Sequence, residues 1–136
     1  DMKKKGDVLE SSEEYKIWLR QSDRDIITAK HSLENQDYYA SAFWAQQSAE
    51  KALKSAILKE KNELIKTHSI IKLARILEAS KDIIEKADLF EPVHQATRYP
   101  DISASYPEED YDKENTEILI KYAEEIRTWA KKKISL

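Results

Sequence analysis

The sequence of 136 residues has no cysteine, three prolines and a single glycine, Gly6. The absence of cysteine excludes disulfides, thiolate metal sites and a cysteine nucleophile. Glycine makes up roughly 7% of an average protein, and its near absence here excludes the glycine-rich loops that bind phosphates or dinucleotides. It also disfavours the tight hairpins of β-rich folds. Any phosphate would have to be held by lysines, by an arginine or by the start of a helix.

Long apolar runs are missing as well. No stretch is long enough to span a membrane or to form the core of a signal peptide, so a cytoplasmic protein is expected. Charged residues make up 36% of the chain, compared with about a quarter in average proteins. Lys and Glu dominate them, and this composition is typical of thermophiles.

What is present is helical periodicity. Apolar residues recur at spacings of three and four along most of the chain after a flexible tail at residues 1–10. The sequence therefore predicts an all-α fold, an antiparallel up-and-down bundle of four to five helices formed by residues 11–136. The expected helices cover residues 11–34, 38–59, 67–80, 82–97 and 112–133, with Pro92 bending or interrupting the fourth and an acidic loop at 99–113.

The second predicted helix is unusual because its apolar face is rich in alanine. Small side chains on a helix face allow a neighbouring helix to approach closely, which predicts a central position in the bundle. Asp37 is expected to cap this helix, and Thr67 or Ser69 the next one. The alanines are Ala42, Ala45, Ala49, Ala52 and Ala56.

Charge is unevenly distributed along the chain, whose formal net charge is −3. Residues 51–75 contain seven basic and two acidic side chains, whereas residues 76–117 contain twelve acidic and four basic ones. One interpretation is an ordinary solvated surface. The other is a basic patch for phosphates or for an acidic face of a second copy. The negative total argues against sequence-independent coating of DNA.

Three segments together resemble the HEPN domain family (higher eukaryotes and prokaryotes nucleotide-binding). Residues 42–54 read AFWAQQSAEKALK, residues 67–70 read THSI, and residues 98–101 read RYPD. The resemblance covers roughly residues 12–132. It implies a four- or five-helix bundle that forms a homodimer, and one of two activities. Some members are metal-independent ribonucleases, often toxins paired with a minimal nucleotidyltransferase as antitoxin, and others are noncatalytic binding or accessory domains.

The nuclease members carry an arginine followed, after four to six residues, by a histidine that can move a proton while the arginine holds the phosphate. Arg98 lies in the matching region, but no histidine follows it, and Tyr106 is the first side chain there that can exchange a proton. Arg24 and His31 have the required spacing, yet they lie on the first predicted helix, and we interpret this match as coincidental. The catalytic candidates are Arg98, Tyr106 and His68.

Binding candidates follow from helical spacing and from the resemblance. They are Gln46, Glu50, Lys51, Lys54, Arg98 and Asp101. In the functional interpretation the two lysines and Arg98 hold phosphates of a nucleotide or RNA. In the structural alternative Gln46 and Glu50 form hydrogen bonds that fix the bundle, and the lysines pair with nearby acids.

No cofactor or metal is expected. The Glu-x-x-His spacing at residues 91–94 has no second copy, as a di-iron bundle would require. The sequence favours an accessory protein that binds a nucleotide, RNA or a partner nucleotidyltransferase, as a homodimer and without a membrane. The alternatives are a metal-independent ribonuclease of a toxin–antitoxin pair and a purely structural dimerisation module.

Overall fold

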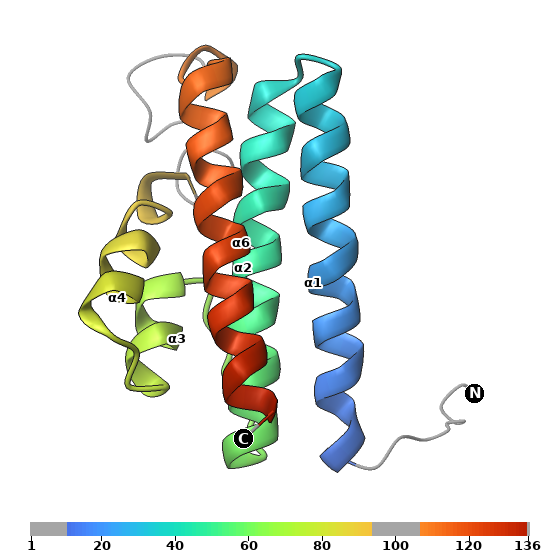
Figure 1. The fold of residues 1–136 in the computed structure, drawn as a ribbon, viewed down its shortest axis with the longest axis vertical. Coiled ribbons are helices and arrows are strands. Elements are labelled where there is room, and N and C mark those ends of the chain that lie inside the picture. Colours follow the sequence, from blue (N-terminus) through green and yellow to red (C-terminus); the bar gives the residue numbers. More distant parts are fainter. Residues whose placement is uncertain (1–10, 94–106, 136) are drawn as a thin grey trace.

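The computed structural model describes residues 11–93 and 107–135 and shows an all-α bundle in these segments, as the periodicity predicts (Figure 1). Three long helices form its body. The elements are α1 (Ser11–Glu34), α2 (Tyr38–Lys61), α3 (Ile70–Ile76), α4 (Lys81–Asp88), the 3-10 turn η2 (Pro107–Glu109) and α6 (Lys113–Ser135). None of the described helices is long and apolar enough to cross a bilayer.

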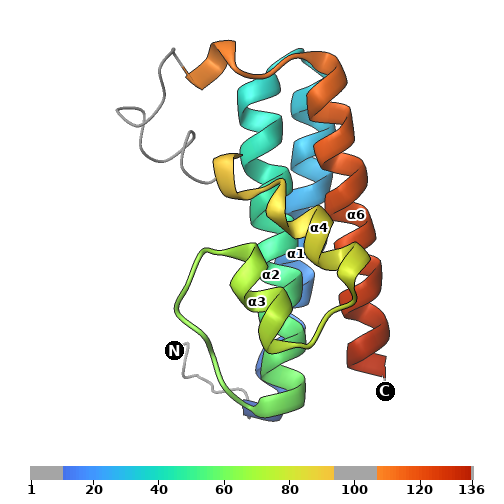
Figure 2. The ribbon, with the colours of Figure 1, turned by 90° about the vertical axis from the view of Figure 1, so that its left-hand side faces the viewer.

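The long helix α2 lies between the other elements. Helix α1 runs antiparallel to it on one side, and α6 runs in the same direction as α2 (Figure 1). The short helices α3 and α4 lie on the opposite side of α2 from α1 and carry the chain back along the bundle (Figure 2). The up-and-down order is thus kept, with two short helices in place of a long third one.

Three serines of α2 fix its contact with α1. Their hydroxyls donate to backbone carbonyl oxygens of the neighbouring helix, and all three side chains are fully buried. The pairs are Ser41 Oγ to Ala29 O at 2.7 Å, Ser48 Oγ to Ser22 O at 2.8 Å and Ser55 Oγ to Tyr15 O at 2.7 Å. The donors on α2 rise by seven residues per step while the acceptors on antiparallel α1 fall by seven, so the contacts repeat about every two helical turns. We call this set the serine ladder.

Small residues make α2 the buried centre of the fold. Fourteen of its 24 residues are buried, and most of them are alanine or serine. The larger core side chains come from the surrounding elements, among them Leu73 of α3, Phe90 after α4 and Ile126 of α6. The predicted central position of this helix is therefore confirmed.

Side chains cap the helices where the sequence suggests. Asp37 Oδ1 accepts from the Ala40 N–H at the start of α2, and Ser69 Oγ accepts from the Lys72 N–H at the start of α3. Ser80 is not the end of the third helix, as predicted, but the cap of α4. Each cap satisfies one of the backbone donors that a helix start leaves unpaired.

Helices α3 and α4 are shorter than predicted. Helix α3 ends at Ile76 instead of Ser80, and α4 ends at Asp88, although the sequence predicted a helix to residue 97. The cause at α4 is Pro92, whose ring would clash with the carbonyl four residues earlier, at Asp88. The chain turns at residues 89–90 and is helical again at 91–93. Residues 94–97 of the predicted helix, and the tail at 1–10, lie outside the described residues.

The scarcity of glycine is visible at the helix ends. The turns after α1, α2 and α3 each contain a residue with a left-handed backbone, and none of the three is glycine. They are Gln36 (φ 62°), Asn62 (φ 55°) and Glu78 (φ 55°). Left-handed backbone costs a residue with a Cβ atom about 1 kcal/mol or more, and asparagine tolerates it better than most.

Substitution of Glu78 by glycine should therefore stabilise the protein. We expect Glu78→Gly to raise the free energy of unfolding by about 0.5–1 kcal/mol, because the relief of the left-handed strain exceeds the added backbone entropy of the unfolded chain. Chemical denaturation measures the change. Glu85→Gly, inside α4, is the control and should lose roughly 1 kcal/mol. Destabilisation by both variants would contradict the explanation.

The serine ladder predicts that α1 and α2 have no room for a larger side chain between them. Ser48→Ala removes one hydroxyl and should cost about 1 kcal/mol. Ser48→Leu must also displace the facing helix and should cost roughly 1–3 kcal/mol more than the alanine variant. Urea unfolding of the two variants measures the difference. A leucine variant as stable as the alanine variant would show that the helices are not held at close contact.

Candidate functional site

A buried carboxylate, Glu50 of α2, is the centre of the polar cluster in the described part of the chain. Its residue is only 4% exposed. Glu50 Oε2 accepts a hydrogen bond from Lys54 Nζ at 3.0 Å and lies 3.1 Å from His68 Nδ1, and Oε1 accepts from Gln46 Nε2 at 3.1 Å. We call these four residues the Glu50 cluster.

Local structure explains how these side chains meet. Gln46, Glu50 and Lys54 are spaced by four residues, so they lie on one face of α2, one turn apart. His68 comes from the segment before α3, and Gln46 Nε2 also donates to its backbone carbonyl at 3.4 Å. At the entry to α3, Thr67 Oγ1 accepts from the Ser69 N–H at 3.2 Å. The cluster thus fixes the loop between α2 and α3 to the central helix.

The electrostatics of the cluster favour an ionised carboxylate. Burial alone would raise the pKa of Glu50, but hydrogen bonding and charge from Lys54, with further hydrogen bonds from His68 and Gln46, outweigh it and lower the pKa. A carboxylate with a lowered pKa is a weak proton acceptor at neutral pH. Glu50 therefore serves to position its neighbours, and it is a poor general base.

Two groups of the cluster differ in their access to solvent. Lys54 is 7% exposed, and its ammonium group lies 5.6 Å from the centre of the Trp18 ring of α1. The side chain of His68, in contrast, is 51% exposed. Gln46 Oε1 is buried and accepts no hydrogen bond within the described residues, and an unmet buried acceptor costs roughly 1–3 kcal/mol. The cluster reaches the surface through His68.

Lys51 lies apart from this cluster. Its ammonium group donates to Asp25 Oδ2 at 2.7 Å and to Gln21 Oε1 at 3.4 Å, both on α1. Asp25 is 5% exposed, so the pair is largely shielded from water. The lysine side chain is 17% exposed. Lys51 therefore neutralises a buried carboxylate of α1, whereas Lys54 neutralises Glu50.

The structure brings together four of the predicted site residues, those of the Glu50 cluster. These hydrogen bonds and the Lys51–Asp25 pair are of the kind that the structural alternative describes, although it names no partner for Lys51. A role in ligand binding stays a prediction. Arg98, Asp101 and Tyr106 lie outside the described residues, as does His94. Within residues 11–93 and 107–135, no three histidine or carboxylate side chains come together in a way that could hold a metal ion.

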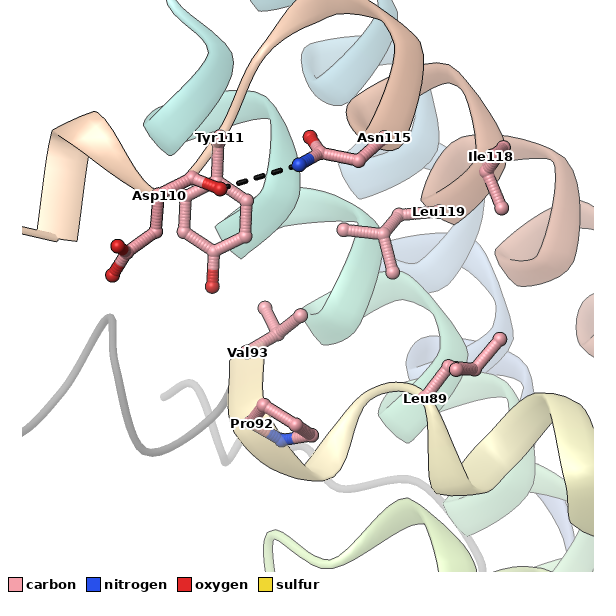
Figure 3. Close-up of a pocket in the computed structure, with 8 residues that line it drawn as sticks. All are labelled: Leu89, Pro92, Val93, Asp110, Tyr111, Asn115, Ile118 and Leu119. Carbon is pink, nitrogen blue, oxygen red and sulfur yellow. Dashed lines mark hydrogen bonds between the residues drawn. The ribbon is translucent and has the colours of Figure 1, made fainter. Parts of the chain in front are cut away.

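A second feature is an apolar pocket of about 350 Å³ between the end of α4 and the start of α6 (Figure 3). Leu89, Val93 and Leu119 form much of its wall, with the Tyr111 ring at one side. Burial, with the nearby carboxylate of Asp110 and the Tyr39 hydroxyl, raises the pKa of Tyr111 to about 12, so its hydroxyl stays protonated at neutral pH.

Sequence reasoning missed the partners of Lys51 and this pocket. The signal for Asp25 was present, because Ser22, Asp25, Ile26 and Ala29 share the buried face of α1, and a carboxylate on a core-facing stripe requires a cation. The pocket left no comparable signal, since its walls are ordinary apolar residues brought together by the interruption at Pro92.

Comparison with known proteins identifies a family. The sequence profile of the HEPN domain matches residues 15–134. Among solved structures, TT1696 from Thermus thermophilus superposes with a TM-score of 0.81 at 29% identity, over 88% of this chain and 97% of that one. ST0689, an archaeal HEPN homologue, gives 0.77 at 29% identity over the same shares. No sequence among the curated proteins matches.

A third solved structure has the same fold at lower identity. The HEPN domain protein tm0613 from Thermotoga maritima superposes with a TM-score of 0.68 at 24% identity, over 87% of this chain and 97% of that one. These relatives share the whole bundle, since nearly their full length is matched. The order of helices described above is thus common to proteins that differ at about seven positions in ten.

The Glu50 cluster predicts a specific pH dependence of stability. Because the pKa of Glu50 is below its ordinary value of 4.5, its contribution is complete above that pH and is lost as the pH falls through the lowered value. Glu50→Gln leaves Lys54 buried without a counter-charge and should cost roughly 3 kcal/mol at neutral pH. The stabilities of wild type and variant should converge in acid, as denaturant titrations between about pH 7 and pH 3 would show.

Glu124→Gln is the matched control for this prediction. Glu124 pairs with Lys30 at the surface, where both side chains are at least 40% exposed, and its loss should cost less than about 1 kcal/mol. A constant difference between wild type and Glu50→Gln at all pH values would contradict the assigned role of the ionised carboxylate.

Proposed function

This chain belongs to the HEPN domain family, and on that premise we propose that it is an accessory protein that binds a nucleotide or RNA without cleaving it. The observation that carries the proposal is the Glu50 cluster. Its carboxylate is saturated by Lys54, Gln46 and His68 and has a lowered pKa. Such a group can hold a surface histidine in place for a ligand but cannot act as an efficient base at neutral pH.

In this proposal His68 and the segment 98–101 contact the ligand. The side chain of His68 is half exposed, and its Nδ1 lies 3.1 Å from the buried carboxylate of Glu50. Its ring is therefore a hydrogen-bonding group with a fixed position at the surface. Arg98 supplies a guanidinium group for a phosphate, and Asp101 is the second candidate of this segment. Lys51 and Lys54 act indirectly, because each already neutralises a buried carboxylate.

The proposed assembly is a cytoplasmic homodimer, with a minimal nucleotidyltransferase as a possible protein partner. Both expectations come from the resemblance of residues 42–54, 67–70 and 98–101 to the family. Sedimentation velocity of the purified chain tests the dimer directly. Co-purification with a minimal nucleotidyltransferase encoded by a neighbouring gene, after the two are expressed together, tests the partner.

A second candidate function is that of a metal-independent ribonuclease. The contact between His68 Nδ1 and Glu50 favours it, since a carboxylate that holds one ring nitrogen is a common way to orient a histidine for proton transfer. The lack of a histidine after Arg98 argues against it. The two functions differ in whether His68 must carry a proton or only donate a hydrogen bond.

One set of variants separates these functions. We expect wild type to bind ATP or a short single-stranded RNA, and Arg98→Ala to weaken binding about tenfold or more, the usual cost of a lost charged hydrogen bond. His68→Gln keeps a donor toward Glu50 and should retain most of the binding. Calorimetry with ATP and fluorescence anisotropy with labelled RNA measure affinity, and gel analysis after incubation in EDTA shows whether RNA is cut.

Lys121→Ala is the matched control, since this exposed lysine of α6 has no ion pair among the described residues. It should change affinity less than about twofold. Absence of binding by wild type, or equal losses in the control and in Arg98→Ala, would refute the proposed site. Cleavage by wild type that His68→Gln abolishes would establish the ribonuclease instead.

A further inference from the structure

The pocket between α4 and α6 has exposed apolar side chains at its edge as well as an apolar interior. Leu89, at the end of α4, and Ile118, on α6, both line it and are 49% and 44% exposed (Figure 3). Five large apolar side chains are exposed in the described part of the chain, and two of them meet at this pocket. Apolar groups left in water around a concave surface are typical of a contact with another molecule.

Carboxylates surround this pocket. The residues that line it, together with the described residues within two positions of them along the chain, include eight acids and two lysines. Five of the acids are exposed and form no ion pair within residues 11–93 and 107–135. We call these five the acidic rim: Asp88, Glu108, Glu109, Glu114 and Glu117.

The other three acids already have partners and are not counted in the rim. Glu91 accepts a hydrogen bond from Ser69 Oγ at the start of α3. Asp112 Oδ1 accepts from the Asn115 N–H at 2.9 Å and so caps the start of α6. Asp110 takes part in other interactions. The argument from charge therefore depends only on the five carboxylates of the rim.

Nearby lysines do not neutralise the acidic rim. Lys86 of α4 pairs with Asp82 and Glu125, which are not part of it. Lys113 lies about 140° around α6 from Ile118, on another side of the helix. Lys121 comes three residues after Ile118 and so lies near the pocket, but it supplies one positive charge against five negative ones. The surface around the pocket is therefore negative.

We propose that this pocket and the acidic rim bind a basic amphipathic segment of another protein. A bulky apolar side chain of that segment fills the pocket, whose volume of about 350 Å³ is at the lower end for ligand sites and suits an anchor of this kind. Lysines or arginines on either side of the anchor then face the rim carboxylates, and this complementarity selects a basic partner over a neutral or acidic one.

Other occupants fit the same observations less well. A symmetric pairing of two copies of the chain would bring one acidic rim against the other, and like charges across an interface are unfavourable. A head-to-tail pairing would not close on itself and would form open chains unless its rotation completes a ring. A small apolar molecule could enter the pocket but would gain nothing from the rim. The proposed homodimer should therefore form through another face.

The binding experiment uses three synthetic peptides of about 16 residues, long enough for two or more anchors on one helical face. The first has leucine on one face and lysine on the other. In the second, serine replaces every leucine, and in the third, glutamate replaces every lysine. Fluorescence anisotropy measures the affinity of each labelled peptide for the whole chain at several salt concentrations. Amide chemical shifts of Leu89, Val93, Ile118 and Leu119 locate the binding site.

Two variants of the pocket have matched controls. Ile118→Ser removes an apolar side chain from its edge, and Ile17→Ser removes one of similar exposure, 46%, from α1. The variant Asp88→Asn/Glu114→Gln removes two charges from the acidic rim. Its control, Glu34→Gln/Glu63→Gln, removes two exposed carboxylates elsewhere that form no ion pair among the described residues. Thermal melts and ATP binding are measured for all four variants.

We expect the leucine–lysine peptide to bind wild type and to shift the four amide resonances of the pocket. Ile118→Ser should weaken this binding about tenfold or more. The rim variant should weaken it about three- to tenfold at low salt, with a smaller difference as salt screens the charges. Both controls should change affinity less than about twofold. ATP binding should be the same in all variants, because the proposal does not depend on the proposed nucleotide site.

Four results would overturn the proposal. The first is that the leucine–lysine peptide does not bind wild type. Equal binding of the serine peptide would show that charge alone attracts the peptide, and equal binding of the glutamate peptide would show that the rim selects nothing. Sedimentation velocity in which Ile118→Ser turns a dimer into a monomer would assign this face to a second copy of the chain.

Discussion

The close contact between α1 and α2 depends on three buried hydroxyls that donate to the backbone of the facing helix. Ser41, Ser48 and Ser55 replace the large apolar side chains that usually separate two helices. Because each donor finds a carbonyl, the polar groups can be buried without an unmet hydrogen bond. The repeat of seven residues also fixes the register, so that Asp25 meets Lys51 and the two ion-paired residues become part of the seam.

The candidate site follows from this register. Since α1 packs on α2 along the serine ladder, the Glu50 cluster forms beside that contact, where Lys54 reaches Trp18 of α1 and the loop before α3 supplies His68. The carboxylate of Glu50 is buried and therefore requires the charge of Lys54, yet the half-exposed side chain of His68 still contacts it from the surface. On the far side of α1, the same packing directs Asp23 and Asp25 toward α6 and α2 and leaves Arg20 and Arg24 facing water. One arrangement of helices thus explains why each of these buried carboxylates has a cation beside it.

The extent to which the sequence predicts these features differs between backbone and site. Helix type, the central position of α2 and the caps at Asp37 and Ser69 follow from local spacing and are confirmed. Helical spacing alone predicts that the fourth helix runs to residue 97. Helix α4 ends at Asp88 instead, because the ring of Pro92 would clash with the carbonyl of Asp88. The neighbours of Gln46 and Glu50 on α2 are predictable, because helical geometry fixes them. The Asp25–Lys51 pair and the position of His68 are not, since they join segments 26 and 18 residues apart.

The serine ladder also has a consequence for how stability changes with temperature. The heat capacity of unfolding grows with the apolar surface that unfolding exposes. A seam built from serine and alanine exposes little such surface per residue compared with one built from leucine. The curve of stability against temperature should therefore be broader and flatter than in a bundle of equal length with a leucine-rich seam.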